Sequence, residues 1–253
     1  MTVLDEPRTT TATMRPRRRS GWLMAGGVLA LATVGWFALQ TVALLAHRTT
    51  TDRREFPAAA VRSVEVTTDG GDVRLVGGSG DRIRVTATIE EGLRSPRNSQ
   101  RITDGVLSVS SDCPTWSIAW CDVSYVIELP SDVAVRVKTD SGDVSLSRLT
   151  NTVTISTDTG NVNATAAGPG AISITSDTGD VDLTFDASPT TLTVSTDTGD
   201  IEVVLPADGR AYLLSAESDT GDIATKVTTD PASAYPIKLV SDDGDISVRY
   251  ASP

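Results

Sequence analysis

Histidine, cysteine and aromatic residues are scarce in this chain. Its 253 residues include one histidine, His47, and two cysteines, and 4% of them are aromatic. Residues 48–253 therefore contain no histidine, which excludes Ser-His-Asp and Cys-His catalytic arrangements from that part of the chain. Two cysteines without a nearby histidine are also too few ligands for a zinc site. The commonest catalytic and metal centres are thus not expected.

Positive charge is rare beyond the N-terminus. Residues 1–60 carry eight arginines against four acidic residues, whereas residues 61–253 carry 14 basic residues against 29 acidic ones. The two parts have formal charges of +4 and −15, which sum to −11 for the whole chain. Recognition of phosphates needs clustered Lys and Arg, so we expect no nucleic-acid partner. A domain with this negative charge is compatible with the binding of cations.

One long stretch lacks charge altogether. It runs from Gly21 to Ala46, 26 residues, and as a helix it would measure about 39 Å at roughly 1.5 Å per residue, enough to span a bilayer. The alternatives are a cleaved signal peptide, whose apolar core is usually about 7–15 residues, and a buried globular helix. We expect a transmembrane helix preceded by a cytoplasmic cluster, since four arginines stand before it: Arg15, Arg17, Arg18 and Arg19.

This orientation places the acidic body outside the cytoplasm. Arg48, Arg53 and Arg54 on the other flank make the charge bias imperfect. From Val61 to Pro253, Val, Ile and Thr dominate and no segment keeps helical spacing of apolar residues, so we expect an all-β domain. The predicted organisation is a cytoplasmic tail, a transmembrane helix, a juxtamembrane linker and an extracytoplasmic domain, at residues 1–20, 21–46, 47–60 and 61–253.

An acidic turn recurs along this domain and can be aligned on one glycine. Apolar residues stand five and seven residues before the glycine and two residues after it, as Val66, Val64 and Val73 do in the first unit. Alternation by two on both sides of a fixed corner predicts a strand, a turn and a strand in each unit. Tandem units of 18 to 23 residues predict a parallel β-solenoid. The aligned glycines are Gly71, Gly142, Gly160, Gly179, Gly199, Gly221 and Gly244.

Polar residues surround each glycine in fixed columns. A hydroxyl stands three residues before it, and by parity it points inward, where we expect it to hydrogen-bond at the corner. Aspartates on both sides are expected to cap the turn by accepting backbone N–H bonds. The first column contains Asp140, Asp158, Asp177, Asp197, Asp219 and Asp242, and the second contains Asp143, Asn161, Asp180, Asp200, Asp222 and Asp245.

Stacking these carboxylates has an electrostatic cost. At about 4.8 Å between rungs, neighbours repel by roughly 0.9 kcal/mol in water and about 3.5 kcal/mol at an effective dielectric of 20. Asn161 accepts the same bonds without charge, which favours capping. Loose Ca²⁺ binding is the alternative, with weak candidate ligands Asp177, Asp180, Asp197 and Asp200. We otherwise expect no cofactor.

The two cysteines, Cys113 and Cys121, lie in "CPTWSIAWC". An exported domain permits a disulfide between them, which would close a short loop carrying Trp116 and Trp120. Two free thiols are the alternative.

An enzyme is the main functional alternative, because right-handed β-helices include polysaccharide hydrolases and lyases. However, the repeat supplies a near-identical carboxylate pair on nearly every rung, and no pair stands out as the unequal acid and base that catalysis requires. The glycine-rich "VGGSGDR", Val76–Arg82, follows no phosphate-loop pattern and is interpreted as a turn. We therefore expect no catalytic residues.

The repeats resemble the bacterial putative-adhesin domain of unknown function, which occurs in single-span envelope proteins. The resemblance rests on "TTDGGDVRL", on "VIELPSDVAVRVKTDSGDVSL" and on the later acidic-turn units, and it covers Val61 to Tyr250. It implies surface exposure and attachment, and it transfers no catalytic residue. The cysteine loop departs from the simple repeat.

Together these patterns predict a single-pass membrane protein that displays an extracytoplasmic β-solenoid as a binding, scaffold or envelope-sensing module. The expected partners are the lipid bilayer, through residues 21–46, and a glycan or an envelope protein. The alternatives are a carbohydrate-active β-helix enzyme and a Ca²⁺-stabilised structural spacer. A groove in which acidic and basic side chains converge outside the repeat columns would favour the enzyme.

Overall fold

The computed structural model describes residues 33–36, 48–91, 95–113 and 121–251. The chain divides into two units, Met1–Leu45 and Ala46–Pro253, and a helical turn at 33–36 is what is described of the first. Within the described ranges, no helix has the length and apolar character needed to cross a bilayer. The predicted tail and most of the predicted span at 21–46 lie outside these residues and stay predictions.

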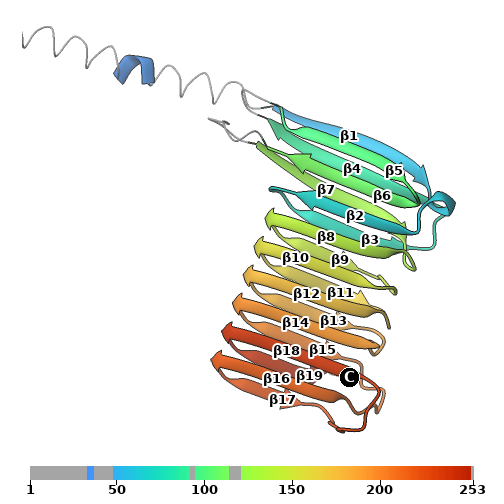
Figure 1. Cartoon of the computed structure of the whole chain (residues 1–253), viewed down its shortest axis with the longest axis vertical. Coiled ribbons are helices and arrows are strands. Elements are labelled where there is room, and N and C mark those ends of the chain that lie inside the picture. Colours follow the sequence, from blue (N-terminus) through green and yellow to red (C-terminus); the bar gives the residue numbers. More distant parts are fainter. Residues whose placement is uncertain (1–32, 37–47, 92–94, 114–120, 252–253) are drawn as a thin grey trace, which may run out of the picture. The chain divides into compact units, whose positions relative to one another are not determined.

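The second unit is all-β, as predicted, and most of it is built from stacked rungs (Figure 1). Each rung is a strand, a corner and a second strand. The rungs are β2 and β3 (Ser63–Thr68, Val73–Gly78), β8 and β9 (Ala134–Ser141, Val144–Ser147), β10 and β11 (Val153–Thr159, Val162–Ala167), β12 and β13 (Ala171–Thr178, Val181–Phe185), β14 and β15 (Thr191–Thr198, Ile201–Leu205), β16 and β17 (Leu213–Thr220, Ile223–Lys226), and β18 and β19 (Pro236–Asp243, Ile246–Tyr250).

The rungs pair in parallel and enclose one core. The first strands of the rungs lie in a nine-stranded sheet and the second strands in a ten-stranded sheet. Val64, Val66 and Val73 are fully buried, and their counterparts in later rungs are buried in register, such as Val153 opposite Val135. Because alternate residues of a strand face opposite sides, these β-branched residues fill the space between the sheets while polar residues face solvent. The predicted alternation is therefore confirmed.

The last two rungs do not stack in chain order. β18 pairs with β14 and β19 pairs with β15, so the rung of β16 and β17 lies beyond them at the end of both sheets. Ala216 is in register with Leu239, and Thr225 with Val248. At these two positions the larger apolar residue lies in the enclosed rung and the smaller or more polar one lies at the end, where less apolar surface can be buried, whereas Ile223 and Ile246 are identical.

The opposite end of the solenoid is antiparallel, which the prediction of a parallel solenoid did not include. β4 (Arg82–Glu91) pairs with β7 (Cys121–Pro130), and β5 (Arg97–Thr103) pairs with β6 (Val106–Asp112). β7 and β6 continue in parallel into β3 and β2. These strands come from the insertion between the first two rungs.

The predicted linker at residues 47–60 is wrong for most of its length. β1 (Arg48–Pro57) forms a ten-residue antiparallel pair with β4, and a short 3-10 helix, η1 (Ala58–Ala60), follows it. The strand was not predicted because its sequence is polar, and an exposed edge strand needs little alternation of apolar residues. Its charges suit an edge, since charged side chains discourage pairing with other chains.

Candidate functional site

The inward hydroxyl column lies at the corners, as predicted. Its members in the enclosed rungs are at most 2% exposed. Thr139 donates to the carbonyl of Ser141 at 2.8 Å, and Ser241 donates to the carbonyl of Gly199 at 3.1 Å. Thr157 and Ser176 differ, because their buried hydroxyls have no partner among the described residues. Most of these hydroxyls thus satisfy backbone carbonyls where the chain turns.

The second aspartate column forms a hydrogen-bonded ladder between rungs. The backbone N–H of Asn161 donates to Asp143 Oδ1 at 2.8 Å, that of Asp180 donates to Asn161 Oδ1 at 2.9 Å, and that of Asp200 donates to Asp180 Oδ1 at 2.9 Å. Asn161 accepts as the aspartates do. The predicted capping is confirmed for this column, but each side chain caps the neighbouring rung rather than its own turn.

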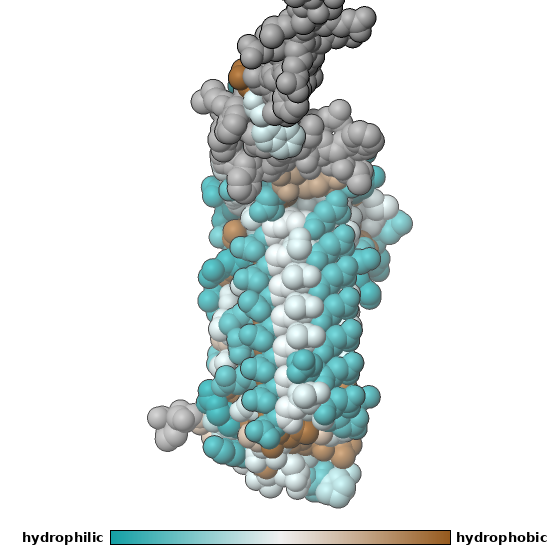
Figure 2. Space-filling view, turned by 90° about the vertical axis from the view of Figure 1, so that its left-hand side faces the viewer, coloured by the Kyte–Doolittle hydropathy of each residue, from teal (hydrophilic) through white to brown (hydrophobic). Residues whose placement is uncertain are grey.

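The first aspartate column differs, although both columns flank the pale stripe of small residues in Figure 2. In the part of the chain that the structure describes, its carboxylates accept no hydrogen bond. Asp177 and Asp197 thus belong to an exposed, unbonded column, whereas Asp180 and Asp200 belong to the ladder. Among the described residues no three acidic, histidine or cysteine side chains are placed to hold a metal ion. The structure therefore does not gather the four calcium candidates into one site.

Glycine is required at the corner for two reasons. Gly179 and Gly199 have φ values of 144° and 145°, which L side chains rarely adopt. In addition, a Cβ at either position would overlap the carbonyl of the glycine on the preceding rung. The glycines therefore stack backbone on backbone along the corner.

Cys113 and Cys121 form a disulfide, with their Cα atoms 6.0 Å apart. The backbone N–H of Cys113 donates to Asp69 Oδ2 at 2.9 Å, which ties the bridge to the corner of the first rung. The loop between the cysteines, with both tryptophans, lies outside the described residues.

Asp122, next to this bridge, was not singled out in the sequence. Its Oδ1 is buried and has no hydrogen-bond partner among the described residues. Burial, followed by the nearby charge of Glu90, raises the pKa of the Asp122 carboxyl. The carboxyl is thus held where its charged form is disfavoured.

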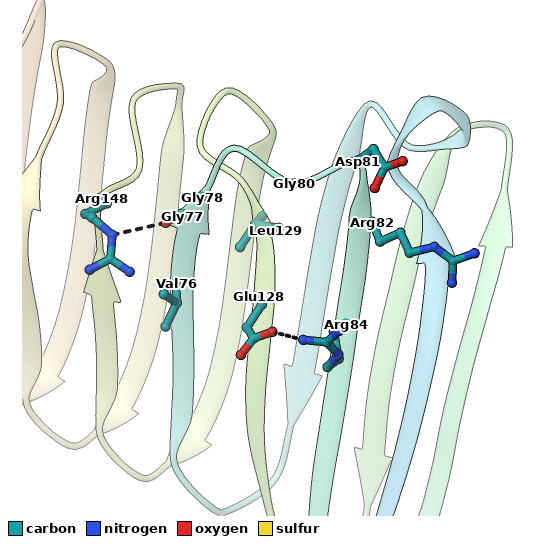
Figure 3. Close-up of a pocket in the computed structure, with 10 residues that line it drawn as sticks. All are labelled: Val76, Gly77, Gly78, Gly80, Asp81, Arg82, Arg84, Glu128, Leu129 and Arg148. Atoms are coloured by element: carbon teal, nitrogen blue, oxygen red, sulfur yellow. Dashed lines mark hydrogen bonds and ion pairs between the residues drawn. The ribbon is translucent and has the colours of Figure 1, made fainter.

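A cavity of about 430 Å³ lies at the end of the rungs opposite the corners (Figure 3). The predicted turn "VGGSGDR" forms one wall of it, with Arg84 on β4, Glu128 on β7 and Arg148 after β9 on the other sides. Its lining residues come from positions 76–84, 128–129 and 148. Sequence reasoning missed this cavity because the segments meet only after the insertion has folded back.

Charged side chains converge along one side of the cavity. Glu55 accepts from Arg82 at 2.6 Å and from Arg84 at 3.1 Å, and Arg84 also pairs with Glu128 at 2.5 Å. The hydrogen bonds from Arg82, and then from Arg84, lower the pKa of the Glu55 carboxyl. The same carboxylates raise the pKa of the Arg84 guanidinium. The charges of these carboxylates and guanidinium groups are therefore compensated by ion pairs within the cluster.

Arg148 is bound differently. Its Nε donates to the carbonyl of Gly77 at 3.2 Å, and none of the carboxylates that the structure describes forms an ion pair with it. Its backbone has a φ of 55°, which is uncommon outside glycine. A Cβ at Gly77 would overlap the carbonyl of Arg148. Gly77 thus allows a close approach that holds an uncompensated guanidinium at the cavity.

The described body is an all-β solenoid with a continuous core and a cavity lined by both charged and apolar residues. Residues 133–249 match the family described as Toastrack DUF4097, a family of unknown function, which confirms the resemblance expected from the sequence over these residues. No curated protein matches the chain.

Solved structures also resemble it. A putative cell adhesion protein from Clostridium sporogenes is 13% identical with a TM-score of 0.51, and the match covers 81% of this chain and 100% of that one. A putative adhesin from Bacteroides fragilis is 14% identical with a TM-score of 0.42, covering 80% and 97%. At such identity the first likeness shows the fold alone.

Proposed function

We propose that this chain is a membrane-anchored, extracytoplasmic binding module. The apolar stretch at 21–46 would hold it in the bilayer, with the arginines at 15–19 on the cytoplasmic side. The Cys113–Cys121 disulfide supports an exported body, because such bonds persist outside the cytoplasm. The continuous core supports a stiff scaffold on which a binding site is held.

We further propose that the cavity binds an anionic group, such as a carboxylate of an envelope glycan. The observation that carries this proposal is Arg148, a guanidinium held at the cavity without a carboxylate partner among the described residues. A planar guanidinium with free N–H donors suits a carboxylate or a phosphate. The remaining lining arginines are already paired, so they would shape the site more than they would neutralise the ligand.

Glycan binding by the purified full chain tests this proposal. We expect it to bind glycans that carry carboxylates better than neutral ones, and we expect Arg148→Gln to weaken that binding roughly tenfold or more, because a charge-assisted hydrogen bond contributes about 1.5–3 kcal/mol. Arg101→Gln, which removes an exposed arginine that does not line the cavity, should leave binding unchanged. Equal losses in both variants, or binding that ignores the glycan's charge, would contradict a specific anion site.

A carbohydrate-active enzyme is a second candidate, and one observation favours it. Asp81 and Glu128 lie with arginines in one cavity outside the repeat columns, the arrangement expected of that alternative. Against it, Glu128 is ion-paired to Arg84, and a nearby cation stabilises the charged carboxylate and so makes a poor general acid. Release of reducing ends from a polysaccharide, lost in Glu128→Gln, would support the enzyme over the binding module.

A further inference from the structure

The rung of β16 and β17 leaves both sheets open at one end of the solenoid. β16 pairs only with β18, and β17 only with β19, so each has an unpaired edge in the described structure. Unpaired edge strands present a row of backbone donors and acceptors that can pair with another strand.

The core is open at the same place. Ile223 is 45% exposed, although Ile246, its neighbour in register, is fully buried. All four residues of β17 are exposed. Figure 2 shows apolar side chains gathered at this lower end of the corner face, below the polar columns. Natural solenoids usually close such an end with a polar capping repeat.

The corner of this rung lacks the partners that other corners have. At the corners of Gly142, Gly160, Gly179, Gly199 and Gly244 the glycine N–H donates to the next rung, as Gly244 does to the carbonyl of Thr220. Gly221 has no such acceptor among the described residues. The aspartate ladder also stops here, because Asp222 donates to Asp245 Oδ1 but its own carboxylate receives no N–H from the described chain. At this one face of the described structure, backbone groups are unpaired, apolar core residues are exposed, and the last aspartate of the ladder has no N–H donor.

We propose that a second copy of this chain docks on this face, with β16 against β16 and β17 against β17 in antiparallel pairs. This inference is independent of the cavity and of the proposed ligand. A two-fold contact covers every exposed edge of both copies with one surface, and therefore closes as a dimer instead of growing into a filament. Both sheets and the core would then run on through the interface.

The charge distribution favours the arrangement in which β16 lies against β16 and β17 lies against β17 of the other copy. The corner end of the rung carries Glu217, Asp219 and Asp222, whereas Lys226 lies at the opposite end. A two-fold axis along the strands would place one acidic corner against the other. An axis perpendicular to the sheets instead places each acidic corner beside the end of the other copy that carries both Lys226 and Asp230, so each corner meets Lys226 and no longer faces another corner.

Sedimentation of the purified full chain in detergent, over a range of concentrations, tests the proposal. We expect a dimer, and we expect Ile223→Lys to raise its dissociation constant at least tenfold, because a charge would enter the apolar contact. Thr225→Lys, on the same open face, should also raise the dissociation constant at least tenfold. Either variant can therefore test the proposal if the other fails to fold. Val126→Lys is the matched control, since Val126 is 39% exposed on β7, away from this end, and it should remain a dimer.

Three results would overturn the proposal: a monomer at every concentration, including one that binds a different protein; open-ended polymers; or a dimer that Ile223→Lys and Thr225→Lys leave intact. Salt tests the orientation separately. Pairing of unlike charges predicts that the dissociation constant rises with salt and rises in Lys226→Glu. A dissociation constant that falls with salt would mean that the acidic corners face each other, which contradicts the pairing of β16 with β16 and of β17 with β17.

Discussion

The corner glycines are the residues on which the stack depends most directly. Gly199 combines a φ of 145° with backbone contact to the rung before it. We expect Gly199→Ala to lower the free energy of unfolding by at least about 2 kcal/mol, because the added Cβ meets both backbone strain and overlap. Urea unfolding measures this loss.

Gly209→Ala is the control for that substitution. Gly209 also has a positive φ, 79°, but a Cβ there would meet nothing within 4 Å. Its loss should be smaller, and the difference isolates the overlap between stacked rungs. Equal losses at the two positions would mean that stacking of the corners tolerates a Cβ.

The aspartate ladder predicts unequal roles for the two columns. Asp180 accepts the N–H of Asp200, whereas Asp177 accepts no hydrogen bond from the described residues. Asp180→Ala should therefore cost about 0.5–2 kcal/mol, the range of lost side-chain caps, and Asp177→Ala should cost less. Asp180→Asn should cost little, because Asn keeps the acceptor and removes repulsion between rungs. Thermal melts compare the three variants.

Calcium binding predicts a different dependence of the melting temperature on Ca²⁺. If Asp177, Asp180, Asp197 and Asp200 hold Ca²⁺, millimolar Ca²⁺ should raise the melting temperature of the unmutated protein, and both the Asn and the Ala variants should lose that increase. The ladder predicts melting temperatures that are the same with Ca²⁺ and with chelator. A large increase confined to the unmutated protein would refute capping as the main role.

Asp122 predicts a dependence of stability on pH. Its pKa is raised above the ordinary value of 3.8, so the unfolded chain loses the proton first as the pH rises. The folded state is then penalised as the pH increases from about 3.8 through the folded pKa, and the penalty remains at neutral pH. Asp122→Asn should be more stable than the unmutated protein at pH 7 and should lose this advantage below the unfolded pKa.

Urea midpoints at pH 7 and below pH 4 measure this difference. Asp158→Asn, at an exposed carboxylate of the first column, is the control for removing one charge from an acidic protein. A similar gain in both variants would assign the effect to net charge instead of to the buried oxygen.

At the scale of elements, the disulfide connects the end of β6 to the start of β7. It closes a short loop, for which the chain-entropy estimate is roughly 2–3 kcal/mol. We expect Cys113 and Cys121 in exported, unreduced protein to resist alkylation until a reductant is added, and we expect the Cys113→Ser, Cys121→Ser double variant to unfold at lower urea. Rapid alkylation without reductant would show that the bridge does not form.

At the scale of the whole molecule, topology is the decisive prediction. The arginines at 15–19 predict that a reporter fused after Pro253 is active only when exported. A fused alkaline phosphatase should be active and a fused fluorescent protein that folds only in the cytoplasm should be dark. The reverse pattern would place the solenoid in the cytoplasm and would remove the basis for an envelope ligand.

The repeated turn let the sequence alone predict the all-β class, the strand and corner of each rung, the buried columns and the acceptor role of the second aspartates. These features are local or periodic, because alternation by two and the φ that glycine allows act over a few residues and then recur. Val64, Thr139 and Gly199 could be assigned in this way. The cysteines could be paired because the loop between them is short.

Only the tertiary structure decided how distant segments meet. The polar strand β1 pairs with β4, the rung of β18 and β19 stacks before the rung of β16 and β17 so that Leu239 and Val248 are enclosed, and Arg148 reaches the glycine-rich turn through a close backbone contact. No periodic signal encodes these contacts. They depend on which of several compatible strand pairings encloses the most apolar surface, a comparison made over the whole fold.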